Sequence, residues 1–351
     1  MGLIEILVAL AMSTAVIGTV IQIFINSKQS YEIQETLARM QENGRHALQL
    51  LGRDVRMTGY VGEIQEYWNI TESESNPTKL PATISGECFT APFRWVAPML
   101  TMIDHDNDPG TLDVIAPKIG GANNGIGVYG NCVPAADQVP DSDIITLHFV
   151  GPEAAPDGTR VRDRLYIRTD LTHGKVFRCN NNSGNCTPVG GGVFDAETDT
   201  YHPLQAIIYY VRKCRDPGAD GQCGTTDDGD QPNIPSLVKV ELQEDGTMVA
   251  NVVAEGIADM QIQYGIDTNY SGYASQYKNA NDIGNVTDPG TWLEWNRVKA
   301  VRIWLLVRST TAQSGFTDNN VYQLGDHTIS PANSFRHQLF TMTAAVRNFS
   351  E

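Results

Sequence analysis

Positive charge is scarce in this chain of 351 residues, where 25 lysines and arginines stand against 41 aspartates and glutamates and the formal net charge is −16. The first 60 residues hold five basic and five acidic side chains, so the other residues carry the whole excess, with 20 basic groups against 36 acidic ones. Such an acidic body is repelled by nucleic acid and by anionic lipid. The composition therefore argues against a nucleic-acid partner.

Motifs of enzymes and redox proteins are also missing. The seven histidines form no H-E-x-x-H motif, and the chain has no G-x-S-x-G motif and no Walker loop. No C-x-x-C pair occurs, which argues against zinc, thioredoxin-like chemistry and covalent haem. Aromatic residues make up only 8% of the chain, which favours packing over electron transfer as their role. We therefore do not expect an enzyme.

The cysteines are few, even in number and confined to the body of the chain. Turn-forming residues between the third and fourth cysteines, and between the fifth and sixth, favour local pairing within each of these two pairs, which leaves the first cysteine with the second. Other pairings remain open on sequence grounds. Three disulfides indicate an oxidising compartment, the periplasm or the cell exterior. The six disulfide candidates are Cys88, Cys132, Cys179, Cys186, Cys214 and Cys223.

A long apolar run is present only at the N-terminus, from Leu3 to Ile25, and Glu5 is its one charged residue. As a helix rising ~1.5 Å per residue, the run is long enough to cross a bilayer. No lysine or arginine precedes Lys28, which argues against a cleavable secretory signal. A plain membrane anchor explains the length of the run but gives Glu5 no role. A carboxylate in hydrocarbon costs about 2.5 kcal/mol or more, so Glu5 is a functional candidate.

The apolar run continues into an amphipathic pattern. Gly59 is the expected helix stop, so one helix of roughly 55 residues is predicted, with residues 1–26 apolar and residues 27–58 amphipathic. The change of pattern near Asn26 indicates two environments along one helix. The amphipathic stripe, spaced by three and four residues, comprises Ile33, Leu37, Met40, Gly44, Ala47 or Leu48, Leu51 and Val55.

The rest of the chain, residues 59–351, is predicted to be a globular, β-rich head. In residues 298–307 one alternating face is continuously apolar, as in a strand covered by the long helix. The expected class is therefore α+β, a long helix packed on a mainly antiparallel sheet, with disulfide-stapled loops and insertions near 69–142 and 265–296. Residues 257–260 are expected to form one helical turn. The predicted strands are 144–149, 164–168, 175–178, 206–212, 237–243, 248–254, 260–265, 298–307 and 338–346.

Two sets of residues carry a resemblance to known proteins. The opening MGLIEILVAL resembles the start of a mature type IV pilin, with Glu5 at the family's glutamate position and Met1 in place of the usual phenylalanine. The segments Gln34–Tyr60, Val298–Ser309 and Phe340–Asn348 are similar to the PilW family of pilins. The resemblance implies leader removal, N-methylation of Met1 and assembly of the helices into a filament core. In that core, Glu5 of one subunit meets the Met1 amino group of a neighbour, since pairing two charges offsets the cost of burying each.

The predicted function is that of a structural subunit of a type IV pilus-like filament, in a PilW-like assembly role or as the main subunit. Its partners are then further copies or other pilins, and its location is the inner membrane before assembly and the cell surface afterwards. A type II secretion pseudopilin and a membrane-anchored periplasmic binding protein are the alternatives.

Two acidic clusters are candidate calcium sites, because spaced carboxylates present oxygens to a hard cation. The first cluster lacks the glutamate that closes an EF-hand loop, and Pro109 occupies its turn. The second cluster lies around the loop between Cys214 and Cys223. Solvated acidic loops are the alternative for both. The candidate ligands are Asp104, Asp106, Asp108 and Asp113 in the first cluster and Asp216, Asp220, Asp227, Asp228 and Asp230 in the second.

Calcium is predicted to raise the melting temperature of residues 27–351, because a cation removes the repulsion within a carboxylate cage. Ligand at ~100 times its dissociation constant adds about 2.7 kcal/mol to the free energy of unfolding. Joint replacement Asp220→Asn and Asp228→Asn should abolish the shift, with Asp106→Asn and Asp108→Asn tested in parallel for the first cluster. Absence of both titration heat and thermal shift at millimolar calcium would identify two solvated loops.

Overall fold

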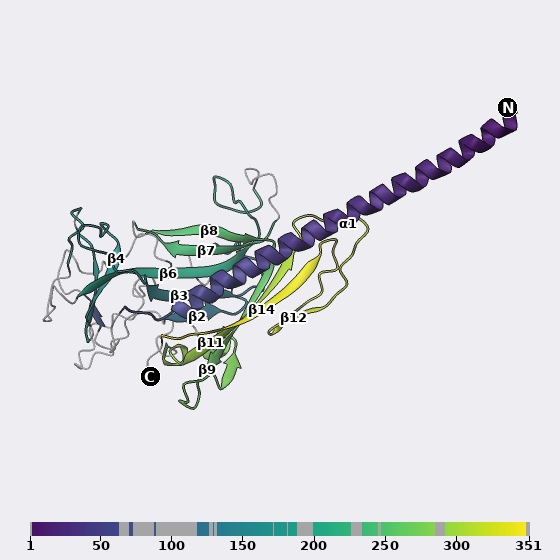
Figure 1. Cartoon of the computed structure of the whole chain (residues 1–351). Helices are drawn as coiled ribbons and strands as arrows, with labels where there is room; N and C mark the ends of the chain where they lie inside the picture. The colour runs from purple at the N-terminus through teal and green to yellow at the C-terminus, as the bar shows by residue number, and fades with distance from the viewer. Residues whose placement is uncertain are drawn as a thin grey trace.

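A computed structural model gives the architecture of the chain (Figure 1). A single long helix, α1 (Leu3–Met57), lies with its second half along a body of strands, while its first half projects away from that body. The described residues are 2–62, 70–72, 88, 118–125, 129, 132–170, 172–180, 182–187, 199–225, 234–244, 247–284 and 292–348. The predicted α+β class is confirmed.

Helix α1 is 55 residues long, as the sequence predicts. It ends where the Thr58 amide donates to the carbonyl of Asp54 at 3.1 Å and Gly59 adopts a φ of +77°. That left-handed conformation suits glycine, which has no Cβ to clash. The Gly59 amide then donates to the carbonyl of His148 at 2.9 Å, so the chain turns directly into the body.

The larger sheet has eight strands and is organised around β6 (Thr200–Arg212). Residues 200–203 of β6 pair with β4, residues 204–209 with β3, and residues 207–212 with β7. Among the described strands, β1 and β5 form the parallel pair and the other pairs are antiparallel. The remaining strands are β1 (Ile70–Glu72), β2 (Ile119–Ala122), β3 (Ile144–Val150), β4 (Leu165–Thr169), β5 (Gly174–Arg178), β7 (Ser236–Leu242) and β8 (Met248–Glu255).

The second sheet is antiparallel with the order β10-β9-β11-β14, and a separate hairpin joins β12 to β13. The nine predicted strands are confirmed, although β6 begins six residues before the predicted start at residue 206, whereas the other ends agree within three residues. The helical turn expected at 257–260 is wrong, because these residues pair with β11 and strand pairing decides their conformation. The elements are β9 (Ile257–Ile266), β10 (Gln276–Lys278), α2 (Ala280–Ile283), α3 (Trp292–Trp295), β11 (Val298–Arg308), β12 (Tyr322–Leu324), β13 (His327–Ile329) and β14 (His337–Ala345).

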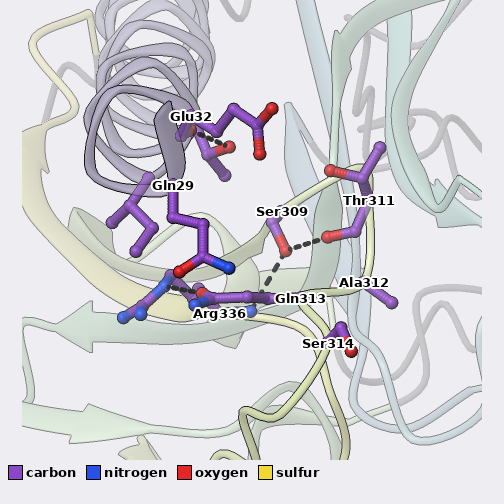
Figure 2. A pocket seen from close by; sticks show the side chains of 10 residues that line it. Gln29, Glu32, Ser309, Thr311, Ala312, Gln313, Ser314 and Arg336 are labelled. Atoms are coloured by element: carbon purple, nitrogen blue, oxygen red, sulfur yellow. Dashed lines mark hydrogen bonds between the residues drawn. The ribbon is translucent and has the colours of Figure 1, made fainter. Parts of the chain in front are cut away.

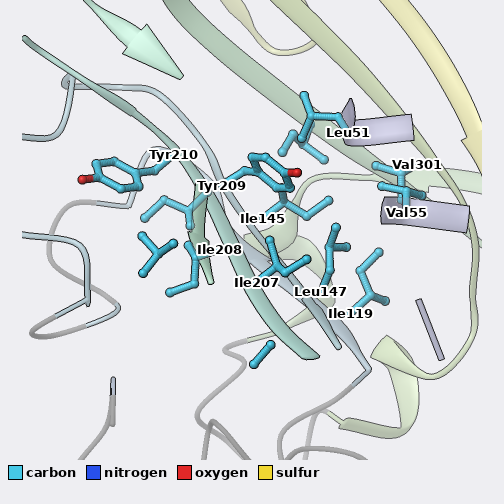
Figure 3. Packing of buried hydrophobic residues seen from close by; sticks show 14 of the residues in the cluster. Leu51, Val55, Ile119, Ile145, Leu147, Ile207, Ile208, Tyr209, Tyr210 and Val301 are labelled. Carbon is cyan, nitrogen blue, oxygen red and sulfur yellow. The ribbon is translucent and has the colours of Figure 1, made fainter. Parts of the chain in front are cut away.

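The hydrophobic core lies between the second half of α1 and the two sheets (Figure 3). Leu51 and Val55 of α1 are completely buried and belong to the same cluster as residues of β2, β3, β6 and β11. The predicted apolar face of residues 298–307 is confirmed, because its alternate residues Val301, Ile303, Leu305 and Val307 are all 0% exposed. The amphipathic stripe is therefore the surface that seats α1 on the body.

Two glycines let α1 approach β14 closely. A Cβ added to Gly44 would lie 2.8 Å from ring carbons of Phe340, and one added to Gly52 would lie 2.7 Å from the terminal methyl carbon of Met342. The aromatic ring and the thioether thus occupy the space that side chains at these two helix positions would otherwise fill. The helix and the strand pack with small residues against large ones.

A buried acidic residue fixes the same half of the helix to the larger sheet. Asp54 is 1% exposed and accepts a hydrogen bond of 2.6 Å from the Tyr209 hydroxyl of β6. Its carboxylate also lies 3.5 Å from the Lys239 ammonium of β7 and accepts from the Arg53 guanidinium at 3.0 Å. Burial, together with the adjacent carboxylate, raises the pKa of Tyr209, so this hydroxyl remains a donor. A buried charge with several partners stabilises one specific docking position.

The predicted disulfide pairing is confirmed. Cys179 joins Cys186 and Cys214 joins Cys223, so each closes a short loop, while Cys88 joins Cys132. Cys179 and Cys186 belong to a small satellite core with Tyr166 and Phe177, beside the outer strands of the larger sheet. The bridges therefore hold loops of the body, and the Cys214–Cys223 loop lies near α1, since Arg215 lines a hollow together with Arg39 and Asn43 of the helix.

Tyr209→Phe should lower the free energy of unfolding by about 1–3 kcal/mol, because it removes a hydrogen-bond donor from a buried carboxylate. The measurement is urea unfolding of the full chain in detergent, followed by near-ultraviolet circular dichroism. Tyr273→Phe is the matched control, since Tyr273 is 78% exposed and its change should stay within ~0.5 kcal/mol. Equal stabilities of the two variants would contradict the role assigned to the Asp54 contact.

Gly44→Ala should destabilise the protein by about 1 kcal/mol. Alanine improves helix propensity by roughly 1 kcal/mol, but overpacking against a rigid ring costs about 1–3 kcal/mol. Gly52→Ala is the comparison, because its new carbon meets the flexible end of Met342 and a nearly neutral change is expected. The same unfolding measurement checks both variants. A stabilised Gly44→Ala protein would show that the contact between α1 and Phe340 can accommodate an extra methyl group.

Candidate assembly surface

The first half of α1 forms a continuous apolar surface outside the body (Figure 1). Within the described residues, α1 is the one helix long and apolar enough to cross a membrane, and no residue of its most apolar 18-residue stretch is buried. Leu3 is 76% exposed and Phe24 is 69% exposed. Soluble monomers rarely expose apolar patches of this extent, so the surface requires lipid or other helices around it.

The few hydroxyl groups in this apolar half are satisfied by the helix itself. Ser13 and Thr14 donate to the carbonyls of Leu10 and Ala11 at 2.9 Å, and Thr19 donates to the carbonyl of Val16 at 2.8 Å. Because these hydroxyls already have partners, their transfer out of water costs less than the transfer of unpaired ones. The polar residues between positions 13 and 19 are therefore compatible with an apolar environment.

The surroundings of α1 change between Gln22 and Met40. Gln22 donates to Asn26 at 3.1 Å, and ion pairs follow from Lys28 to Glu32 at 3.6 Å and from Arg39 to Glu35 at 2.7 Å. These pairs are exposed and contribute little to stability. They keep the helix polar where it leaves the apolar environment and before Met40 enters the core, as the predicted change near Asn26 requires.

A polar hollow lies where α1 departs from the body (Figure 2). Its volume is about 340 Å³, and Gln29, Glu32 and Thr36 of α1 face the loop 309–314 and Arg336 across it. Arg336 donates to Gln313 at 2.6 Å, and the Ser309 hydroxyl donates to the carbonyl of Thr311 at 2.8 Å. These hydrogen bonds join lining residues of the body to one another, and the hollow separates the helix from the loop. It leaves this part of α1 accessible from the side.

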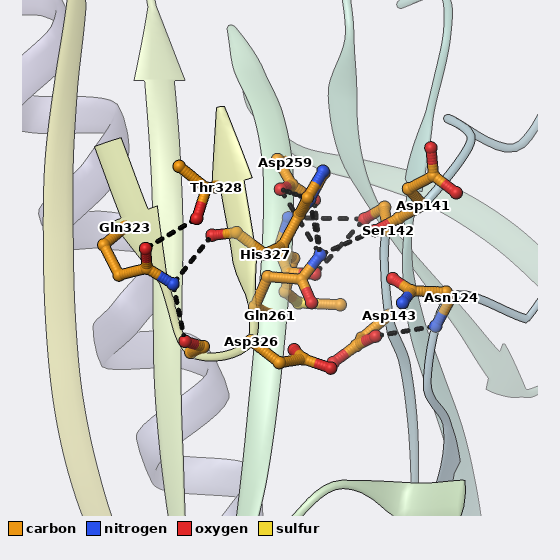
Figure 4. A network of polar contacts seen from close by, with 12 residues as sticks. Asn124, Asp141, Ser142, Asp143, Asp259, Gln261, Gln323, Asp326, His327 and Thr328 are labelled. Atoms are coloured by element: carbon orange, nitrogen blue, oxygen red, sulfur yellow. Dashed lines mark hydrogen bonds and ion pairs between the residues drawn. The ribbon is translucent and has the colours of Figure 1, made fainter. Parts of the chain in front are cut away.

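A polar network fixes the β12–β13 hairpin to the outside of β9 (Figure 4). Asp259 lies 3.0 Å from Nδ1 of His327 and accepts from the Gln261 amide at 3.1 Å, and that amide also donates to the carbonyl of Asp141 at 2.6 Å. Burial raises the pKa of Asp259, although Gln261 and His327 oppose that shift. The network joins three chain segments that are far apart in the sequence, so its role is structural.

The C-terminal end of α1 is capped from the other end of the chain. The Asn348 amide donates to the carbonyls of Arg56 at 3.0 Å, Met57 at 3.3 Å and Thr58 at 3.4 Å. These are among the carbonyls that a helix leaves without an internal partner. Sequence reasoning missed this role, and the nearest signal was an asparagine just after the last predicted strand.

The two predicted assembly residues, Met1 and Glu5, lie at the start of α1. Met1 and the side chain of Glu5 are outside the described residues, although the backbone of Glu5 belongs to the helix. The predicted charge pair between subunits therefore stays a prediction.

The acidic clusters are also described only in part. Asp216 and Asp220 lie in exposed turns, where they accept the amides of Gly218 at 3.1 Å and Gln222 at 2.9 Å. In the part of the chain that the structure describes, no three acidic, histidine or cysteine side chains converge on a position for a metal ion. Calcium binding stays a prediction for residues that lie outside the described ones, namely Asp104, Asp106, Asp108, Asp113, Asp227, Asp228 and Asp230.

Two of the described histidines have structural partners, and a third faces solvent. Nδ1 of His202 is 2.9 Å from the carbonyl of Gly151, and Nδ1 of His337 is 2.9 Å from the buried carboxylate of Asp318. His46 is exposed on α1. Each of these side chains is accounted for by a nearby backbone or carboxylate partner or by solvent.

Comparisons with known proteins agree with this geometry over part of the chain. A search of curated proteins and a search of solved structures each gave no match. One family model matches the chain, over residues 208–348. This range includes Val298–Ser309 and Phe340–Asn348, which the sequence analysis singled out, whereas Gln34–Tyr60 lies before it. Residues 208–348, from within β6 to the Asn348 cap, match the family model described as Type IV Pilus-assembly protein W, which supports a role in type IV pilus assembly.

Proposed function

We propose that this chain is a subunit of a type IV pilus-like filament and that it polymerises through the apolar half of α1. The observation that carries the proposal is one unbroken helix with two surroundings, exposed and apolar up to Ile25 and with one face buried in the body from Met40 onward. A soluble domain has no use for such an extension. A membrane explains the extension before assembly, and a bundle of neighbouring helices replaces the membrane afterwards.

The seat of α1 supports this role. The glycine contacts with β14, the buried Asp54 and the Asn348 cap hold the second half of the helix at three places along its length. The direction of the projecting half is therefore fixed relative to the body. A subunit that joins a regular array needs such a fixed angle, because each helix must meet its neighbours in the same geometry.

Register within the bundle is assigned to Glu5. An ionised carboxylate is costly in an apolar bundle, and the amino group of Met1 on a neighbouring subunit supplies the opposite charge. Leader removal and N-methylation of Met1 belong to the same proposal. The subunit begins in the inner membrane and ends in an extracellular filament, with other copies or other pilins as its neighbours.

Glu5→Gln should leave membrane insertion intact and reduce incorporation into filaments at least about tenfold, because the partner amino group loses its counter-charge. The measurement compares the protein in sheared surface filaments with the protein in membranes by quantitative mass spectrometry. Ser13→Ala is the matched control, since it changes an exposed polar residue of the same helix without changing charge. Normal filament incorporation of the Glu5→Gln chain would eliminate the charge pair as the determinant of assembly.

A further inference from the structure

The β10-β9-β11-β14 sheet has an outer face that α1 does not cover. Phe340 and Met342 point to α1, and their partners on β11 are Leu305 and Ile303, which lie in the core. Side chains alternate between the two faces of a strand, so Arg302 and Trp304 lie on the opposite face. The β12–β13 hairpin lies over the Trp304 end of that face, where a Cβ added to Gly325 would be 3.3 Å from the indole ring, so the part that stays open to other molecules is the part around the half-buried Arg302.

Arg302 on this face lies over the ring of Tyr277 and near that of Trp304. Its guanidinium carbon lies 4.1 Å from the ring centre of Tyr277 on β10 and 5.8 Å from that of Trp304. The Tyr277 ring packs over Gly265, where an added Cβ would be 3.1 Å from a ring carbon. Stacking holds the guanidinium flat and leaves its edge free to donate two parallel hydrogen bonds to a carboxylate.

Arg302 has no acidic partner within the described residues, where its recorded interactions are with the two rings. An arginine without a counter-charge is unusual on a chain with 41 acidic residues and a net charge of −16. Arg302 therefore presents a positioned positive charge on an acidic protein.

The loop between β9 and β10 extends this surface with two exposed tyrosines. Tyr270 is 79% exposed and Tyr273 is 78% exposed. Asp267 holds the loop in one conformation, since its carboxylate accepts the amides of Ser271 at 3.0 Å and Gly272 at 2.6 Å. Arg297 supports the Tyr270 ring, with its guanidinium carbon 4.6 Å from the ring centre. Tyrosines on a rigid loop give a large contact area at a low cost in conformational entropy, as in binding loops rich in Tyr, Ser, Gly and Asn.

We propose that these six residues, the tyrosine–arginine surface, dock the acidic body of a second copy of this chain. The surface consists of Tyr270, Tyr273, Tyr277, Arg297, Arg302 and Trp304. Tyrosine, tryptophan and arginine are the residues that dominate the binding energy of protein interfaces. A copy with 36 acidic and 20 basic residues beyond position 60 offers carboxylates to Arg302. The surface and its acidic counterpart are different patches, so the contact is head-to-tail and continues from copy to copy.

The inference deepens the proposed function, since it assigns the contact between neighbouring heads, but its test does not require filaments. Sedimentation velocity of the full chain in excess detergent should show concentration-dependent self-association that weakens between about 50 mM and 300 mM salt. Arg302→Glu should lower the association constant at least about tenfold, and Arg302→Lys should lower it less. Tyr273→Ala should lower it several-fold while leaving the melting temperature unchanged, because that side chain is exposed.

Arg162→Glu is the matched control, because it makes the same change of charge at a side chain that is 56% exposed on the larger sheet's loops. A chain that remains monomeric in its micelle at every concentration would overturn the proposal, and so would equal effects of Arg302→Glu and Arg162→Glu. Absence of the protein from surface filaments would instead refute the proposed function and leave this result standing.

Discussion

The structure depends on the burial of one face of α1 between two sheets. Leu51 and Val55 are completely buried there, and Asp54 places a carboxylate against Tyr209 within the same turns of the helix. The apolar contacts supply most of the stability, because they are numerous and remove area from water. The polar contact supplies position, because a buried carboxylate tolerates one arrangement of donors. Together they decide where the apolar half of the helix points.

Both sheets contact this buried face of α1, and they stabilise it through different kinds of contact. The β10-β9-β11-β14 sheet gives α1 a close-packed surface through β14, and the larger sheet gives it polar partners through β6 and β7. The disulfides lie in loops around the outer strands of the larger sheet and its connections. One bridge, Cys88 to Cys132, belongs to the same hydrophobic core as Leu51 and Val55. Helix α1 itself contains no cysteine, so its own contacts with the body are noncovalent.

Much of this fold was predictable because its patterns are local. The spacing of Met40, Leu51 and Val55 gave the buried face of α1, and alternation in residues 298–307 gave the covered strand. The β9 residues 257–260 were mistaken for a helical turn because their pairing with β11 is not visible in a local window. Asp54 and Asn348 could not be assigned either, since their partners Tyr209 and the helix carbonyls lie 155 and about 290 residues away. Local sequence patterns predict which face of a helix or strand is buried, whereas the hydrogen-bond partner of a single polar residue depends on the tertiary structure.

The cap that Asn348 places on α1 has a consequence for the order of synthesis and folding. Strand β14 and Asn348 come at the opposite end of the described chain from the helix that they contact. As the polypeptide emerges N-terminus first, α1 can insert in the bilayer long before its seat exists. Its amphipathic half stays without its final contacts until nearly the whole body has been synthesised. Docking of the helix therefore depends on a complete head, and a chain truncated before β14 would leave the direction of α1 undefined.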